Sequence, residues 1–152
     1  MNTEHVALFF HVLGALLFVS GIVVAGAAFE AARRRSDPRE IAVLLGVTRI
    51  GVVLVAAGGL LVLAFGFWLV HLTDAGFGDA WVSAALALFV LVSLLGAAGG
   101  RRPRQARVLA REGGDVSAVK RLLDDPLSRT ANYASAAIVV AILALMIWQP
   151  GG

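Results

Sequence analysis

The chain has 152 residues and a formal net charge of +3, and 59% of its residues are hydrophobic while only 15% are charged. A soluble domain carries roughly 25% charged residues, so a soluble fold of this composition would lack the polar surface that it needs, whereas a lipid bilayer removes that need. The chain has no cysteine, which excludes disulfides, thiolate metal sites and cysteine nucleophiles.

Four apolar runs follow one another along the chain, at residues 6–29, 46–70, 81–100 and 130–148. Each is close to the length of about 20 residues that a helix needs to cross the ~30 Å hydrocarbon core. None alternates as the strands of a lipid-facing barrel do, and the first is too long for a signal peptide and has no basic residues before it. The sequence therefore predicts an all-α fold, a bundle of four transmembrane helices in a single membrane domain of residues 1–152.

Basic residues mark two of the connections between these runs. Residues 30–45 and 101–129 hold 12 of the 13 Lys and Arg residues, and Arg49 is the last. Because short loops rich in Lys and Arg stay in the cytoplasm, we expect both connections to be cytoplasmic loops and both termini to lie outside. The tryptophans fall at the outer ends of their helices, as in an interfacial belt. The basic residues are not interleaved with aromatic ones, which argues against nucleic acid as a partner.

Each basic loop ends in a helix-start signal. Asp37 and Asp125 are each followed by a proline, the order of an N-cap residue and a Pro at the first helical position. Each half of the chain thus reads span, basic loop, Asp-Pro, span, which raises the hypothesis of two equivalent helical hairpins. A helix from Pro38 to Val70 would be about 50 Å long at 1.5 Å per residue, so we expect its first two turns to project from the membrane or to tilt along its surface.

The long connection holds one amphipathic segment. Beyond the Gly113-Gly114 pair, the apolar residues between 116 and 123 fall on one face of a short helix, and the basic ones lie off that face. Such a helix commonly lies on a membrane surface. We expect it to lie on the inner leaflet; in the alternative interpretation it docks a partner protein.

Small residues recur at helical spacing in two of the spans. In the second span Gly51 and Gly58, and then Gly59 and Gly66, stand seven residues apart. In the fourth span the alanines on one face are Ala131, Ala134, Ala137, Ala141 and Ala144. Small residues let helix backbones approach closely, which drives helix association in lipid. The sequence therefore predicts packing seams along these faces, within the chain or between copies of it.

All three histidines lie toward the outer face. His5 precedes the first span, His11 lies a short way inside it, and His71 ends the second span, with Asp74 following. Imidazole nitrogens bind copper, zinc or haem iron. One hypothesis is therefore a metal site formed by all three histidines, or a haem site formed by His11 and His71. In the simpler interpretation His11 forms a hydrogen bond with a carbonyl of a neighbouring helix, and the other two are solvated.

Two charged residues stand at the inner boundary of the spans. Glu30 ends the first span and Arg49 precedes the uninterrupted apolar part of the second. We expect them to anchor the helices, either as an ion pair with each other or through a lipid phosphate that Arg49 reaches by snorkelling.

A family resemblance rests on the first helix. Residues 10–18, FHVLGALLF, resemble the start of a family of predicted bacterial integral membrane proteins of unknown function. That family has a His-Val-Leu-Gly-Ala opening, an Arg before a Gly-containing second helix, a Trp that opens the third helix and a basic stretch after it. In this sequence Arg49, Gly59, Trp81 and residues 101–111 stand in those places.

Two more distant resemblances imply a cofactor. The chain is similar to the membrane domain of copper-resistance D proteins and to the haem-binding protoporphyrinogen oxidase of the bacterial membrane type. In the oxidase a first-helix His matters, and His11 would take its place. The lysine expected in the helices of that oxidase has no counterpart, since Lys120 is the only lysine and lies in a loop. These resemblances imply copper or haem bound near His11.

The sequence leads to three functional hypotheses. The first is a small non-enzymatic protein of the bacterial inner membrane, acting as an accessory subunit or as a homo-oligomer; the abundance of Ala, Gly, Val, Leu and Arg indicates the bacterial source. The second is copper or haem handling at the outer face. The third is a membrane enzyme or transporter. Catalysis needs positioned acid, base or nucleophile groups, and the spans have no carboxylate in their central depths.

Overall fold

A computed structural model describes residues 2–73 and 76–149. Its helices are α1 (Thr3–Arg33), α2 (Pro38–Leu72), α3 (Ala80–Gly99), α4 (Arg101–Arg111), α5 (Val116–Leu123) and α6 (Pro126–Trp148). The described residues form no strand. Four helices are long and apolar enough to cross a membrane: α1, α2, α3 with its continuation into α4, and α6. The predicted all-α fold with four membrane-spanning helices is confirmed.

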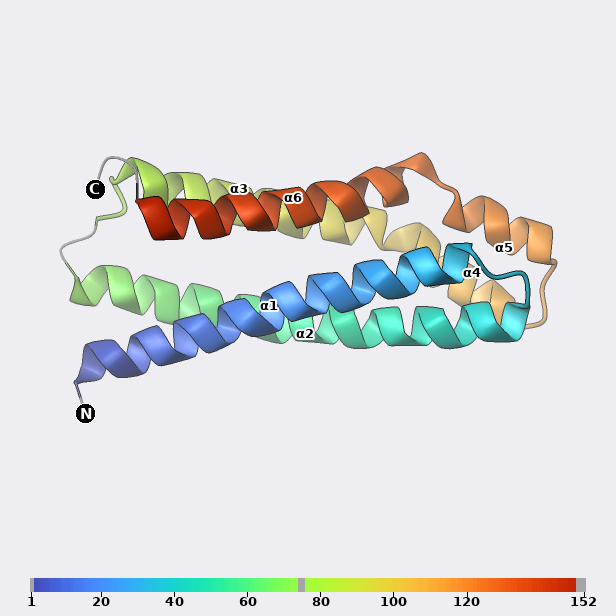
Figure 1. The fold of residues 1–152 in the computed structure, drawn as a ribbon, viewed down its shortest axis with the longest axis horizontal. Coiled ribbons are helices and arrows are strands. Elements are labelled where there is room, and N and C mark those ends of the chain that lie inside the picture. Colours follow the sequence, from blue (N-terminus) through green and yellow to red (C-terminus); the bar gives the residue numbers. More distant parts are fainter. Residues whose placement is uncertain (1, 74–75, 150–152) are drawn as a thin grey trace.

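The four long helices form two antiparallel pairs. The helices α1 and α2 pack along each other, as do α3 and α6, and the two pairs lie in two layers (Figure 1). The start of α1, the end of α2 and the end of α6 lie at one end of the bundle. The turn between α1 and α2 lies at the other end together with α4 and α5, and we call this the basic end.

Both predicted helix starts are confirmed. The Asp37 carboxylate accepts a hydrogen bond of 2.8 Å from the backbone N–H of Arg39 at the start of α2. The Asp125 carboxylate accepts one of 3.0 Å from the N–H of Ser128 at the start of α6. Each cap satisfies a donor that the first turn would otherwise leave free, which stabilises a helix by about 1 kcal/mol.

Glycines hold α1 and α2 in direct backbone contact. A Cβ added at Gly51 would lie 2.6 Å from the carbonyl oxygen of Gly21, and one added at Gly14 would lie 2.7 Å from the Cβ of Leu61. Gly58 faces the backbone of Gly14 in the same way. Neither helix could therefore carry a side chain at these points without moving away from the other. The seam predicted at Gly51 and Gly58 is confirmed, and Gly14 and Gly21 are its counterpart on α1.

The two helix pairs pack on each other through larger side chains. Phe18 of α1, Val92 of α3, and Val139 and Ile142 of α6 form a buried cluster between the two layers. Of the five alanines predicted to line a packing seam of α6, Ala131 is buried, whereas Ala137 and Ala141 are exposed. Of the two places predicted for this seam, within the chain or between copies of it, Ala131 fits the first, whereas Ala137 and Ala141 make no buried contact within the chain. Larger side chains such as Val139 and Ile142 fill the space between the layers instead.

The basic end has a hydrophobic core of its own. Its buried residues are Phe29, Ala32, Ile41, Leu45, Ala106, Ala110, Val119 and Leu123, from α1, α2, α4 and α5. Val119 and Leu123 are 0% and 1% exposed. The apolar face of α5 is therefore covered by the chain itself, and the expectation that it lies on a leaflet or docks a partner is wrong. The first turns of α2 extend past the apolar run, as predicted, and their buried side chains Ile41 and Leu45 pack against α4 and α5.

The basic stretch of residues 101–111 is helical rather than a loop. It continues α3 after a single break at Gly100. Pro103, which is buried, lacks a backbone N–H, and its ring crowds the carbonyl one turn earlier, which bends a helix at that point. α4 packs against α2. The arginines of α4 therefore belong to a helix that packs on the rest of the chain, and not to an irregular loop.

Candidate functional site

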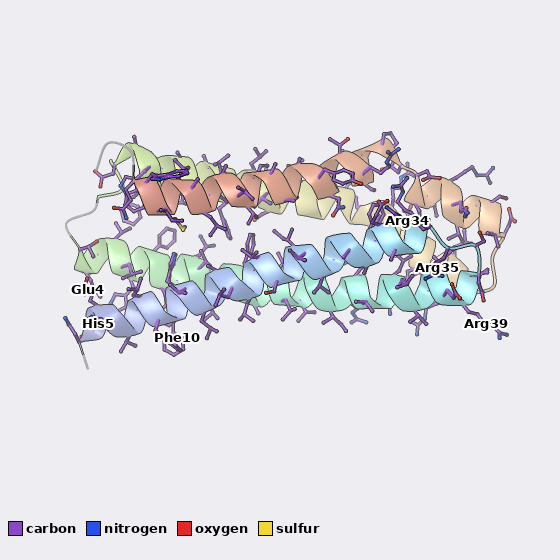
Figure 2. The ribbon with its side chains drawn as sticks, in the orientation of Figure 1. Glu4, His5, Phe10, Arg34, Arg35 and Arg39 are labelled. Atoms are coloured by element: carbon purple, nitrogen blue, oxygen red, sulfur yellow. The ribbon has the colours of Figure 1, made fainter. Side chains whose placement is uncertain are left out.

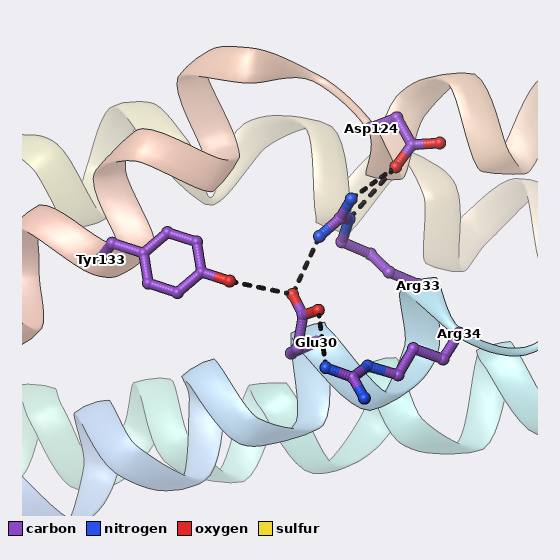
Figure 3. Close-up of polar contacts among 5 residues, drawn as sticks. All are labelled: Glu30, Arg33, Arg34, Asp124 and Tyr133. Atoms are coloured by element: carbon purple, nitrogen blue, oxygen red, sulfur yellow. Dashed lines mark hydrogen bonds and ion pairs between the residues drawn. The ribbon is translucent and has the colours of Figure 1, made fainter.

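Five polar side chains meet where the two helix pairs come together at the basic end; we call them the clasp (Figure 3). Arg33 is at its centre and only 16% of its side chain is exposed. Its Nη1 donates a hydrogen bond of 2.9 Å to Oε2 of Glu30, and its Nη2 donates one of 2.9 Å to Oδ1 of Asp124. Arg34 reaches the other oxygen of Glu30 at 3.4 Å. The hydroxyl of Tyr133 lies 3.5 Å from Oε2 of Glu30, a weak hydrogen bond.

The clasp joins three elements. Glu30 and Arg33 belong to the last turn of α1, Asp124 ends α5, and Tyr133 lies near the start of α6. An exposed ion pair is worth roughly 0–1 kcal/mol, whereas hydrogen bonds to charged groups that are partly buried are worth about 1.5–3 kcal/mol. The interaction of Arg33 with Glu30 is of the second kind, whereas the Asp124 side chain is 60% exposed and its interaction lies nearer the first. Together these contacts hold the end of α5 and the start of α6 against α1.

The expected pairing of Glu30 with Arg49 is absent from the described part of the chain. Glu30 pairs with Arg33 and Arg34 instead. The glycine seam explains why, because Gly51 packs against Gly21 and Ala25. Arg49 therefore lies near the level of Ala25, more than a turn short of Glu30, and its side chain is exposed on the outer face of α2.

His11 links α1 to α2. Its Nδ1 lies 3.1 Å from the carbonyl oxygen of Val62, and the same ring packs against Gly66, where an added Cβ would lie 3.1 Å from it. The hydrogen bond to a neighbouring helix that the simpler interpretation predicted is therefore confirmed. Because Gly66 has no side chain, the imidazole of His11 fits against α2 at this point. Gly66 thus makes room for a side chain, whereas Gly51 and Gly58 make room for the backbone of α1.

The other two histidines do not join His11. His5 is exposed near the start of α1 (Figure 2), and His71 is exposed in the last turn of α2. Asp74 lies outside the described residues. Within residues 2–73 and 76–149, no group of three or more His, Asp or Glu side chains is placed to hold a metal ion.

Hydroxyl groups in the spans bond to their own helices. Ser93 donates a hydrogen bond of 2.8 Å to the carbonyl oxygen of Phe89, and Ser83 donates one of 3.1 Å to that of Asp79. Such bonds to a carbonyl one turn earlier satisfy a hydroxyl in an apolar setting. The hydroxyls of Ser83 and Ser93 thus have their hydrogen-bond partners within their own helices.

The sequence patterns did not predict the clasp. Glu30 was predicted to pair with Arg49, and Arg33 and Arg34 were assigned only to a basic loop. The contact of Arg33 with Asp124 could not be predicted because the two residues are 91 positions apart along the chain. The one available signal was the acidic Asp124-Asp125 pair inside a basic connection. One carboxylate caps α6 and the other is free to pair with Arg33.

Comparison with known proteins gives one match. A family model described as predicted integral membrane protein (DUF2269) matches residues 5–150. No curated protein and no solved structure matches the chain.

Proposed function

The chain belongs to the DUF2269 family of predicted integral membrane proteins, and we propose that it is a non-enzymatic protein of the bacterial inner membrane that works as a homo-oligomer. The observation that carries the proposal is the outward face of α6. Ala136, Ala137 and Ala141 are exposed there, next to Val140, which is 67% exposed. Small residues on an open face let a second helix approach closely in lipid.

The outward face of α2 is bulkier, although it also exposes Ala56, Ala57 and Ala64. Val53 and Leu60 are 60% and 72% exposed, and large residues of this kind stand between its exposed alanines. These large side chains would hold the backbone of a neighbouring helix at a distance, and they are compatible with contact to lipid chains. The contrast supports α6 rather than α2 as the helix that meets a second copy of the chain.

The proposed orientation places the basic end in the cytoplasm and both termini outside, because the positive-inside rule holds for short connections. A single-cysteine variant at Gly78, where an added Cβ meets no other atom, is expected to react with a membrane-impermeant maleimide in intact cells. A cysteine at the exposed Arg104 is expected to react only after the membrane is opened. The opposite pattern contradicts this orientation.

Disulfide cross-linking tests the oligomer, and the lack of native cysteine makes the test clean. Ala137→Cys in native membranes, treated with an oxidant, is expected to give a cross-linked dimer. Val53→Cys is the matched control and is expected to remain monomeric. Gly26 lies against Asn132, and Gly21 lies against Gly51, so this register puts residues 53 and 137 at similar depth.

Three results contradict the proposed homo-oligomer. Equal cross-linking of both variants indicates random collision, and no cross-linking of Ala137→Cys indicates that the face meets lipid. A cross-link from residue 137 to a different polypeptide supports the accessory-subunit hypothesis instead.

Copper or haem handling through His11 is the second candidate. When Nδ1–H of a histidine is held by a backbone carbonyl, the tautomer is fixed and Nε2 presents its lone pair for a ligand. The contact between His11 and Val62 has this form. A visible spectrum and a metal analysis of the purified protein test the candidate. A Soret band or bound copper that His11→Ala abolishes supports it, and a colourless, metal-free preparation contradicts it.

A further inference from the structure

Positive charge is concentrated at the basic end. Twelve of the 13 Lys and Arg residues lie within residues 30–45 and 101–129, which form this end, and Figure 2 shows Arg34, Arg35 and Arg39 at this end, with Glu4 and His5 at the other. The carboxylates in this region are Glu30, Asp37, Glu40, Glu112, Asp115, Asp124 and Asp125. Because the basic residues outnumber these carboxylates, several arginines at this end have no carboxylate to pair with.

Most carboxylates of the basic end either form ion pairs with Arg33, Arg34 and Arg35 or cap a helix. Glu30 and Asp124 pair with Arg33 in the clasp, and Glu40 pairs with Arg35 at 3.6 Å. Asp37 and Asp125 cap helices. On the α1 side of the basic end Arg33, Arg34 and Arg35 each have a carboxylate partner within the chain.

The junction of α3, α4 and α6 is different. Gly99 at the end of α3 packs against Ala131 and Ser128 of α6, with an added Cβ 3.7 Å from the Cα of Ser128. Arg101 and Arg102 stand two and three residues after Gly99, and Arg129 lies between the two residues of α6 that Gly99 contacts. Because α3 and α6 are antiparallel, this register brings the three arginines within about one helical turn of the same level.

These three arginines form no ion pair within the described residues. All are exposed. Asp125 is the carboxylate nearest to Arg129 in the sequence, but it accepts hydrogen bonds of 3.0 Å from both the N–H and the hydroxyl of Ser128. The three guanidinium groups carry like charges, which repel one another when they lie close together. An anion bound between them would offset this repulsion.

We propose that Arg101, Arg102 and Arg129 bind the phosphate headgroup of an anionic lipid. A guanidinium group donates two parallel hydrogen bonds to phosphate oxygens, and a group of arginines at the end of membrane-spanning helices is a typical headgroup site. Neither a second copy of the chain nor a particular leaflet is needed for it, so the inference is independent of the proposed oligomer.

The surroundings favour a lipid over a free anion. The site lies at the end of the apolar part of α3, whose Val90 and Leu94 are 51% and 63% exposed. The acyl chains of a lipid whose phosphate is held by Arg101 would run along these side chains. Free phosphate would gain nothing from this apolar surface.

Lipid binding by the purified full chain tests the proposal. The probe is phosphatidylglycerol added to protein in a neutral detergent, with bound lipid counted by native mass spectrometry and phosphatidylcholine as the neutral reference. The triple variant Arg101→Gln, Arg102→Gln, Arg129→Gln is expected to bind phosphatidylglycerol about a hundredfold more weakly, since each arginine near a headgroup contributes about fivefold. The change to lysine at the same positions is expected to restore part of the affinity, because charge is kept and the bidentate geometry is lost.

A second triple variant is the matched control. Arg39→Gln, Arg111→Gln, Arg121→Gln removes the same charge from exposed positions farther from the spans and is expected to weaken binding less than about tenfold, because the attraction falls off within a Debye length. Equal losses in the two variants overturn the proposal in favour of diffuse attraction. Inorganic phosphate that competes with the lipid at equal concentration also overturns it, in favour of a site for a free anion. Circular dichroism and the elution volume in size-exclusion chromatography show whether each variant is folded.

Discussion

The two helix pairs of this bundle use small residues in opposite ways. In the pair of α1 and α2, glycines face each other, so Gly21 and Gly51 bring the two backbones into contact. In the pair of α3 and α6, bulky residues such as Val139 face inward, while Ala137 and Ala141 face outward. Small residues in a membrane-spanning helix therefore mark a close approach, but only the structure shows whether the partner is in the same chain.

The glycine seam gives the largest expected effect. Gly51→Leu is expected to prevent α1 and α2 from packing, because the side chain would meet the backbone of Gly21, which cannot yield as a side chain could. Loss of the folded protein is expected in a thermal melt in detergent followed by size-exclusion chromatography. Gly46→Leu is the control in the same helix, since nothing lies within 4 Å of a Cβ there. If both variants melt alike, the seam does not hold the first pair together.

The core of the basic end comes next. Leu123→Ala is expected to cost about 2–5 kcal/mol, because it removes a fully buried side chain of α5 and leaves a cavity. Leu127→Ala, at a position that is 53% exposed, is expected to cost much less. Unfolding of both variants in detergent, followed by circular dichroism, measures the difference. Equal costs would mean that α5 is not packed on α1 and α2.

The clasp that joins the two pairs has a smaller expected effect. Arg33→Ala is expected to cost about 1–3 kcal/mol, since it leaves Glu30 and Asp124 without their shared partner. Arg34→Ala is expected to cost at most about 1 kcal/mol, because that side chain is 77% exposed. Hydrogen exchange at the start of α6 is expected to rise only in the Arg33 variant. Equal exchange in both variants contradicts the role of the clasp.

The smallest effect is expected at a glycine outside the seam. Gly46→Ala is expected to stabilise the protein by about 0.5–1 kcal/mol, because alanine favours a helix and no atom is crowded there. The same change at Gly51 is expected to destabilise it. Paired thermal melts of the two variants show whether the sign of the effect differs, and effects of one sign at both positions would contradict the distinction between the seam and the rest of α2.

Local features of the sequence were enough to predict the helices. Charge-free apolar runs and the starts at Asp37 and Asp125 depend only on neighbours along the chain, and these predictions agree with α2 and α6. The seam at Gly51 was also predictable, because glycine has one strong reason to recur in a membrane helix.

Features that depend on distant partners were not predictable. An amphipathic helix such as α5 has the same pattern whether a lipid surface or another part of the chain covers Val119. The apolar residues of α6 do not reveal which face turns inward, since alanine and valine are both compatible with lipid. Likewise Arg33 and Asp124 are joined only by the folded arrangement of α1 and α5.

Energy transfer between dye-labelled copies tests most directly whether the exposed alanines of α6 contact another copy of the chain. Copies carrying donor or acceptor dyes at Gly78→Cys, a position with open space, are mixed in liposomes and diluted with lipid. The parent is expected to keep efficient transfer on dilution, and Ala137→Leu with Ala141→Leu is expected to reduce it to the random level without changing the thermal melt. Transfer in the parent that falls to the random level on dilution, or that persists unchanged in the double variant, would contradict the account.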